Sequence, residues 1–245
     1  MGLSRRLGLA AALLGLGLAP FAGAARAADG FALRLQALLN AGDHAGVSAL
    51  MPAAEAEQWQ QRATRFQAEF PEVRWTVQLG EPGSDGRRGL TVEVRGESMV
   101  EGLRYRLEGS QSLRVLLEEG RLMEQTLLNE QSLLRSGETA LPITLAIPDQ
   151  VLTGSRYDVE VIVDQPLGYS VVAGGLLQLT PEQVRDQARP DLPLAPLGSG
   201  GLFKSVQAPQ RPGVQTWAVM LVHPDGVVTA TKRVRVVNSI QRGTI

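Results

Sequence analysis

Residues 103–117 read LRYRLEGSQSLRVLL, and their apolar side chains fall mostly on odd positions, with charged and polar side chains mostly on even positions. The side chains of a β-strand alternate between the two faces of its sheet. This alternation therefore predicts one long strand with a single buried face, bent at Gly109, where a strand glycine commonly marks a bend.

The pattern continues on both sides of this strand. Residues 73–79 and 90–95 alternate in the same way around a turn that contains Pro and Gly, and a further strand is expected over residues 122–134. Three segments ahead of them carry apolar residues at helical spacing: 31–39, 43–51 and 55–70. This order predicts an α+β cup, in which three N-terminal helices lie on a curved antiparallel sheet.

Two stretches of this first half carry a family resemblance. LLNAGDHAGVSALM (residues 38–51) and FQAEFPEVRW (residues 66–75), followed by the long strands, resemble the nuclear-transport-factor-2-like (cystatin-like) fold over residues 29–136. The resemblance implies a cup whose interior is either filled by side chains or forms a ligand cavity. Related cups include steroid isomerases and dehydratases with an acid and a base on the inner wall, and cups of this family often pair through the outer sheet face.

The second half shows a different organisation. A polar break at residues 136–140 is followed by short alternating segments, and Asp225-Gly226 between two of them is a hairpin signal. A capping-box start at Thr180 predicts a short helix to about Ala188. IPDQVLTGSRYDVEVIVDQPLG (residues 147–168) and RPGVQTWAVMLVHPDGVVTATKRVRVV (residues 211–237) resemble the strand pairs of bacterial immunoglobulin-like domains, which implies a separate all-β sandwich.

The N-terminus has the three parts of a signal peptide. Arg5 and Arg6 precede an apolar run of about a dozen residues, too short to span a bilayer, and small residues follow, so cleavage is expected at Ala27 or Ala28. A membrane anchor is the alternative, and the paired arginines leave the general secretory and twin-arginine routes open. The predicted organisation is 1–27 signal peptide, 28–136 cup, 137–141 linker, 142–238 sandwich and 239–245 tail.

Composition excludes several classes of partner and chemistry. The 24 basic and 25 acidic residues are mixed along the chain, which gives no nucleic-acid patch, and the mature chain has no segment long and apolar enough to span a membrane. There is no Cys, and the two His fall in different halves, so no metal site is predicted. We find no nucleotide-binding or hydrolase motif and expect no cofactor and no catalytic residue.

The inner wall of the predicted cup offers one candidate ligand pocket, formed by Trp75, Tyr105 and His44. Tyr105 is the one titratable side chain on the inward positions of these strands, and His44 is placed to reach a pocket mouth. The alternatives are that Trp75 and Tyr105 belong to the core and that His44 is solvated. The outward arginines form either a solvated salt-bridge lattice or a surface for a homodimer or for docking.

These observations predict an exported, non-enzymatic protein-binding or assembly module of the periplasm or an equivalent lumen. One alternative is a carrier of small apolar ligands, or an isomerase- or dehydratase-type enzyme that uses the cup. Another is a structural component of the envelope.

Overall fold

A computed structural model describes residues 19–137, 141–164, 172–186, 191–197, 200–224 and 226–239, with the backbone alone for 19–29. Its first half consists of α1 (Ala19–Ala41), α2 (His44–Ser48), α3 (Ala53–Glu69), β1 (Glu72–Pro82), β2 (Arg88–Val100), β3 (Leu103–Glu118) and β4 (Arg121–Ser136). Its second half consists of β5 (Ile143–Ala146), β6 (Gln150–Leu152), β7 (Arg156–Val163), β8 (Ala173–Leu179), α4 (Pro181–Arg185), β9 (Ala195–Pro196), β10 (Gly201–Gln207), β11 (Gly213–His223) and β12 (Gly226–Val237).

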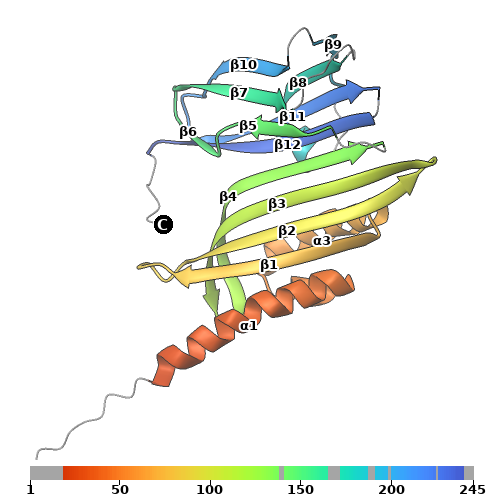
Figure 1. The fold of residues 1–245 in the computed structure, drawn as a ribbon. Helices are drawn as coiled ribbons and strands as arrows, with labels where there is room; N and C mark the ends of the chain where they lie inside the picture. Colours follow the sequence, from red (N-terminus) through yellow and green to blue (C-terminus); the bar gives the residue numbers. More distant parts are fainter. Residues whose placement is uncertain are drawn as a thin grey trace, which may run out of the picture.

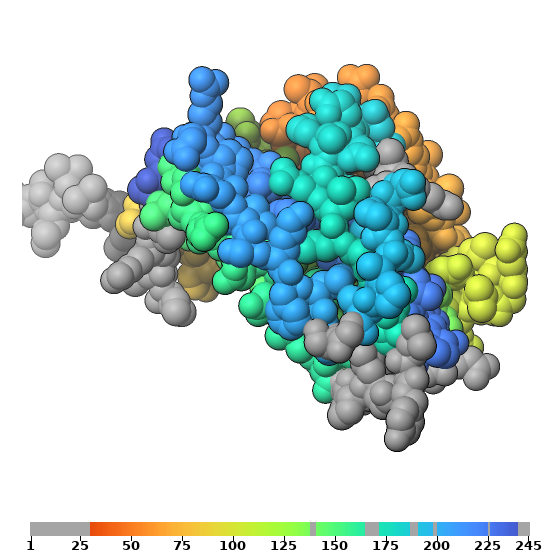
Figure 2. Space-filling model, turned by 90° about the horizontal axis from the view of Figure 1, so that it is seen from above, coloured from red at the N-terminus to blue at the C-terminus, as the bar shows by residue number. Residues whose placement is uncertain are grey.

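The long strands of the first half form an antiparallel meander. β3 covers the full stretch predicted from its alternation, and Leu107 and Val115 on its odd positions are buried. At the tip between β2 and β3, Glu101 and Gly102 both have positive φ, 52° and 80°, as a tight hairpin turn requires. The tip carries exposed apolar side chains and projects beyond the second half of the molecule (Figure 2).

One face of this meander is covered by the N-terminal helices. The core there consists of helix residues Phe31, Leu35, Val47 and Leu50 and strand residues Val77, Leu90, Val115 and Leu122. α1 lies beside the edge strand β1 (Figure 1), and two of its side chains bond the β1 backbone. Asn40 accepts from the amide of Trp75 at 2.8 Å and donates to its carbonyl oxygen at 3.0 Å, while Gln36 accepts from the amide of Val77 at 2.9 Å. The helix thereby satisfies backbone groups that an exposed edge would offer to other chains.

The second half contributes two layers. β5, β7 and β10 form a three-stranded sheet in the order β10-β7-β5, and this sheet packs over β12, β11 and β8 (Figure 1). Val159, Val161, Leu221 and Val234 between the layers are fully buried. The short helix α4 begins with the predicted capping box, in which the Thr180 and Gln183 side chains bond each other's backbone amides.

The two halves share one sheet. Strands β1, β2, β3, β4, β12, β11, β8 and β9 follow one another in a nine-stranded sheet that also includes β6, which pairs with β12. β4 and β12 are antiparallel from Arg135 opposite Val228 to Gln131 opposite Lys232. Ser136 adds a link, because its hydroxyl accepts from the amide of Val227 at 3.2 Å.

The expected fold, a nuclear-transport-factor-2-like cup joined to a separate immunoglobulin-like sandwich, is therefore wrong. β12, the last strand of the described residues, bonds directly to β4, the last strand of the first half, so a mostly-β molecule with one large sheet replaces the cup and the separate domain. The alternation of side chains defines which face of a strand is buried but not which strand is its neighbour. The alternation alone therefore does not predict the long-range pairing of β4 with β12.

Candidate binding groove

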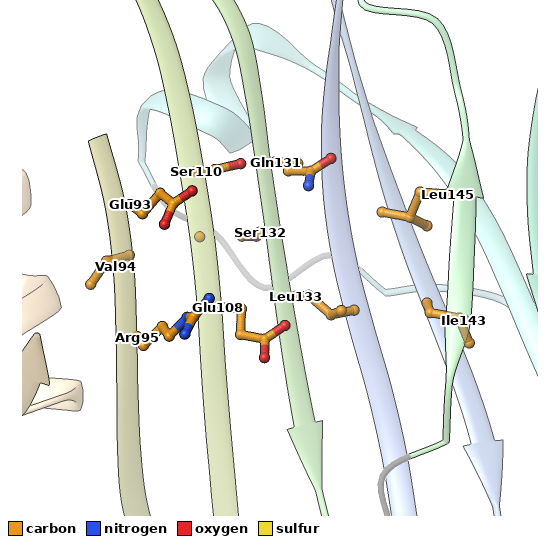
Figure 3. A pocket seen from close by; sticks show the side chains of 11 residues that line it. Glu93, Val94, Arg95, Glu108, Ser110, Gln131, Ser132, Leu133, Ile143 and Leu145 are labelled. Atoms are coloured by element: carbon orange, nitrogen blue, oxygen red, sulfur yellow. The ribbon is translucent and has the colours of Figure 1, made fainter. Parts of the chain in front are cut away.

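A groove opens where the three-stranded sheet ends above the large sheet. It has a volume of about 340 Å³, and its floor comes from β2, β3 and β4 while β5 forms one wall (Figure 3). Its lining residues are Glu93, Val94, Arg95, Glu108, Gly109, Ser110, Gln131, Ser132, Leu133, Ile143 and Leu145. The floor is the face of the meander turned away from the helices, because Glu93 and Arg95 alternate with Val94, which is buried on the other side.

The strand register arranges the floor in two rows that cross the strands. In the first row Arg95 lies opposite Glu108, which lies opposite Leu133. In the second row, two residues along each strand, Glu93 lies opposite Ser110, which lies opposite Gln131. Figure 3 shows Ile143 level with the first row and Leu145 level with the second. We call them the Arg95 row and the Glu93 row.

The two rows differ in charge. In the Arg95 row, Glu108 accepts a hydrogen bond from Arg135 at 3.0 Å and is therefore already paired. Arg95 also lies directly opposite Arg74 on β1, and like charges facing each other across strands are unfavourable. Arg74, Arg95 and Glu93 are exposed and make no hydrogen bond or ion pair within the described residues. The Arg95 row thus presents positive charge and the Glu93 row negative charge.

A buried lysine anchors the far end of the Glu93 row. Lys232 on β12 is 5% exposed and lies opposite Gln131 on β4. Its Nζ donates to Asn129 Oδ1 at 3.0 Å, to Gln131 Oε1 at 3.4 Å and to Asp149 Oδ1 at 2.5 Å. Three acceptors satisfy the three donors of the ammonium group. This cluster, which we call the Lys232 cluster, links the two halves of the chain and orients Gln131 in the groove.

The wall strand β5 is an edge strand. It pairs with β7, and no other strand of the described chain pairs with it. The amide of Asp164 donates to the carbonyl of Pro142, so in the antiparallel ladder Thr144 exchanges its bonds with β7. The N–H and C=O groups of Ile143 and Leu145 therefore point to the free edge, while the side chains of both residues pack against the core that includes Leu133.

The three residues of the predicted ligand pocket lie elsewhere. The His44 ring packs edge-on against Trp59, with 5.6 Å between ring centroids, and Trp75 packs on Phe66 at 5.6 Å. Trp75 is in register with Val94 on β2, which is in register with Gly109 on β3. Tyr105 lies four residues from Gly109 along β3, and this separation is about 14 Å at strand spacing. The structure does not bring Trp75 and Tyr105 together, and none of the three lines the groove.

Of the groove floor, the alternation predicts an outward direction for Glu93, Arg95 and Glu108. The sequence assigns this face either to a solvated salt-bridge lattice or to a pairing surface, and it does not predict a groove. The alternation does not give the position of β5, and β5 is the wall that turns this open face into a groove. Two further observations concern the described residues alone: they contain no cluster of acidic and His side chains suited to a metal ion, and no helix among them is long and apolar enough to cross a membrane.

Buried polar groups between the two sheets of the second half form a separate network. Trp217 Nε1 donates to the Tyr157 hydroxyl at 3.0 Å, and this hydroxyl donates to Gln215 Oε1 at 2.9 Å. Burial raises the pKa of Tyr157, and the hydrogen bond from Trp217 opposes the shift. Gln215 in turn donates to Gln178 at 3.0 Å. Because Tyr157, Gln215 and Trp217 are all buried, we assign this network to the stability of the core.

A family model matches the second half of the chain. Residues 138–237 match the model of a family described as a domain of unknown function (DUF8623). The matched segment contains β5 to β12 and therefore the wall of the groove and Lys232, whereas the floor lies in the preceding part of the chain. No curated protein matches the chain.

Proposed function

We propose that this protein is an exported, non-enzymatic binding module whose groove receives an extended segment of a partner protein. The observation that carries the proposal is the free edge of β5, whose Ile143 and Leu145 backbone groups point over the groove. An extended peptide commonly adds as a strand to such an edge, with main-chain hydrogen bonds giving affinity and alternate side chains giving specificity.

The dimensions of the groove support an added strand. A strand paired with β5 lies about 4.8 Å from it, and packed sheets lie about 10 Å apart. Since β5 packs above Leu133 on β4, the added strand lies above β3, over Glu108 and Ser110. Pro142 and Pro148 flank β5 and limit the pairing to a few residues, so contacts with the floor must supply the rest of the affinity.

The character of the groove favours a peptide over the alternatives considered from the sequence. A carrier of small apolar ligands needs an enclosed and mostly apolar cavity. The floor of this groove instead carries Glu93, Arg95, Glu108 and Gln131 and is open to solvent. Charged and amide side chains on the floor suit a polar, extended chain.

Export is the second part of the proposal. It rests on the predicted signal peptide, of which residues 1–18 lie outside the described residues, and α1 begins at Ala19, ahead of the predicted cleavage site. The test is N-terminal sequencing of the protein recovered from the extracytoplasmic fraction of its host. A mature protein that begins at Ala28 or Asp29 supports the prediction, and an intact N-terminus retained in the cytoplasm contradicts it.

The test of the groove is a screen of displayed random peptides against the protein, followed by titration calorimetry of those that bind. Ser110 projects into the groove from β3, so Ser110→Trp should fill it and weaken binding at least about tenfold. Ser205→Trp is the matched control, because Ser205 is exposed on β10 outside the groove. Peptides that bind Ser110→Trp as well as the unchanged protein, or a screen that yields no binder, would contradict the proposal.

A further inference from the structure

The charges of the groove floor specify an order of charges in the bound segment. Resting on the proposed function, we infer that the groove selects an extended segment in which a basic residue is followed two positions later by an acidic residue, paired antiparallel with β5. The inference depends on three features: the spacing of the two rows, their opposite charges and the direction of pairing.

The spacing of the rows matches the repeat of a strand. In an added strand, the residues opposite Ile143 and Leu145 point to the same side as these two side chains, toward the large sheet. These two residues of the added strand are two positions apart, and the Arg95 row and the Glu93 row are also two residues apart along each strand. The Arg95 row lies level with Ile143 and the Glu93 row lies level with Leu145 (Figure 3). One inward side chain of the segment therefore meets each row.

The charges of the rows set the chemistry of these two side chains. In the Arg95 row the one carboxylate, Glu108, is held by Arg135, so Arg95 and the facing Arg74 remain to attract an anion. In the Glu93 row Gln131 is held by Lys232, which leaves the Glu93 carboxylate and the Ser110 hydroxyl to attract a cation or a donor. An acidic residue fits opposite Ile143 and a basic residue fits opposite Leu145.

The direction of pairing sets the order of the two charges. In an antiparallel strand the residue opposite Leu145 comes before the residue opposite Ile143, which gives basic–x–acidic from N- to C-terminus. Antiparallel pairing is favoured because its ladder is slightly more stable per residue than a parallel one. A second copy of this chain paired through β5 would instead place Ile143 and Leu145 over the two charged rows, so a partner of different sequence suits the floor better.

The experiment uses three ten-residue peptides that differ only at two central positions: Lys-Thr-Asp, Asp-Thr-Lys and Thr-Thr-Thr, each flanked by Ser and Thr. Binding to the protein is measured by calorimetry at low and high salt. We expect the Lys-Thr-Asp peptide to bind about tenfold more tightly than the Asp-Thr-Lys peptide at low salt, because the first peptide forms two exposed ion pairs with the floor where the second meets two like charges. The ratio of the two affinities should shrink at high salt, which screens these charges.

Charge-swapped variants assign the preference to the floor. Glu93→Arg with Arg95→Glu should invert it, so that the Asp-Thr-Lys peptide binds more tightly. The matched control is Arg156→Glu with Asp158→Arg, since this pair has the same spacing and opposite charges but is exposed on β7, away from the groove. The control should keep the original preference.

The outcomes separate this inference from the proposed function. Equal affinity for the two charged peptides, no inversion in the Glu93/Arg95 variant, or inversion in the β7 control would overturn the inference. The inference is also overturned if neither charged peptide binds while displayed peptides of other sequence bind and lose their affinity in Ser110→Trp. In that case the proposed function stands. Only a screen without groove-dependent binders overturns both.

Discussion

Replacing Lys232 by methionine tests whether the two halves of the chain are held together by the Lys232 cluster. Lys232→Met keeps the aliphatic stem but removes the ammonium group, which is bonded to Asn129, Gln131 and Asp149. Removing one partner of a fully buried pair costs about 3–5 kcal/mol. The Asp149 side chain is 49% exposed and regains water when the ammonium is lost, so we expect a smaller loss in the free energy of unfolding, about 2 kcal/mol.

The assay is equilibrium unfolding in urea, followed by tryptophan fluorescence and by circular dichroism. Lys204→Met is the matched control, because Lys204, the other lysine of the chain, is exposed and its Nζ lies over the Trp217 ring, 5.5 Å from the centroid. It should cost no more than about 1 kcal/mol. If Lys232→Met costs no more than the control, or stabilises the protein, the cluster does not contribute as argued.

Three further changes test other parts of the fold. Tyr157→Phe leaves the buried Trp217 Nε1 without its acceptor and should lower the free energy of unfolding by about 1–3 kcal/mol. Because the pKa of Tyr157 is raised in the folded state, the stability that this shift contributes to the parent protein is complete below pH 10 and is lost as the pH rises through the folded-state pKa. The variant should not show this loss at high pH. Asn40→Ala removes two bonds to the Trp75 backbone, which should cost about 1 kcal/mol and promote association through β1, measured by light scattering. Gly226→Ala would place a Cβ 2.0 Å from a β4 carbonyl oxygen and should lower the free energy of unfolding by more than about 2 kcal/mol.

Each of these changes has an outcome that contradicts it. If Tyr157→Phe and the parent have the same urea midpoint at every pH between 8 and 11, the hydroxyl has no role in the stability of the core. A strictly monomeric Asn40→Ala variant of unchanged stability would mean that the edge of β1 needs no cover. Gly89→Ala is the control for Gly226→Ala, because a Cβ at Gly89 meets nothing within 4 Å. Equal stability of the two glycine variants would refute the clash.

The sequence predicted individual elements well because their signals are local. The alternation over residues 103–117 predicted β3 to within one residue of its end, and the Thr180 capping box predicted the start of α4. The arrangement of the strands was not predictable in this way, since Ser132 and Thr231, whose hydroxyls bond at 2.7 Å, are 99 residues apart. One signal was present: Lys232 occupies an inward position of β12 between Ala230 and Val234, and a charge there requires polar partners from another strand.

The candidate site shows the same division. The outward direction of Glu93, Arg95 and Glu108 follows from the alternation. The pairing of Glu108 with Arg135 and the position of β5 above the floor depend on strand register and on the packing of two layers. These determine which charges remain available, and neither is encoded in a short stretch of sequence.

The pairing of β4 with β12 also has a consequence for the order in which the chain folds. β12 follows the other strands of the described chain, so it is synthesised after them and, if the chain is exported unfolded, it leaves the membrane after them. Until residues 226–237 arrive, the backbone groups of β4 from Gln131 to Arg135 have no neighbour on that side. Contacts this distant in sequence form slowly. Completion of the large sheet therefore depends on residues 226–237, and proteolytic loss of β12 would expose an edge of β4 while also uncovering the core between the two sheets.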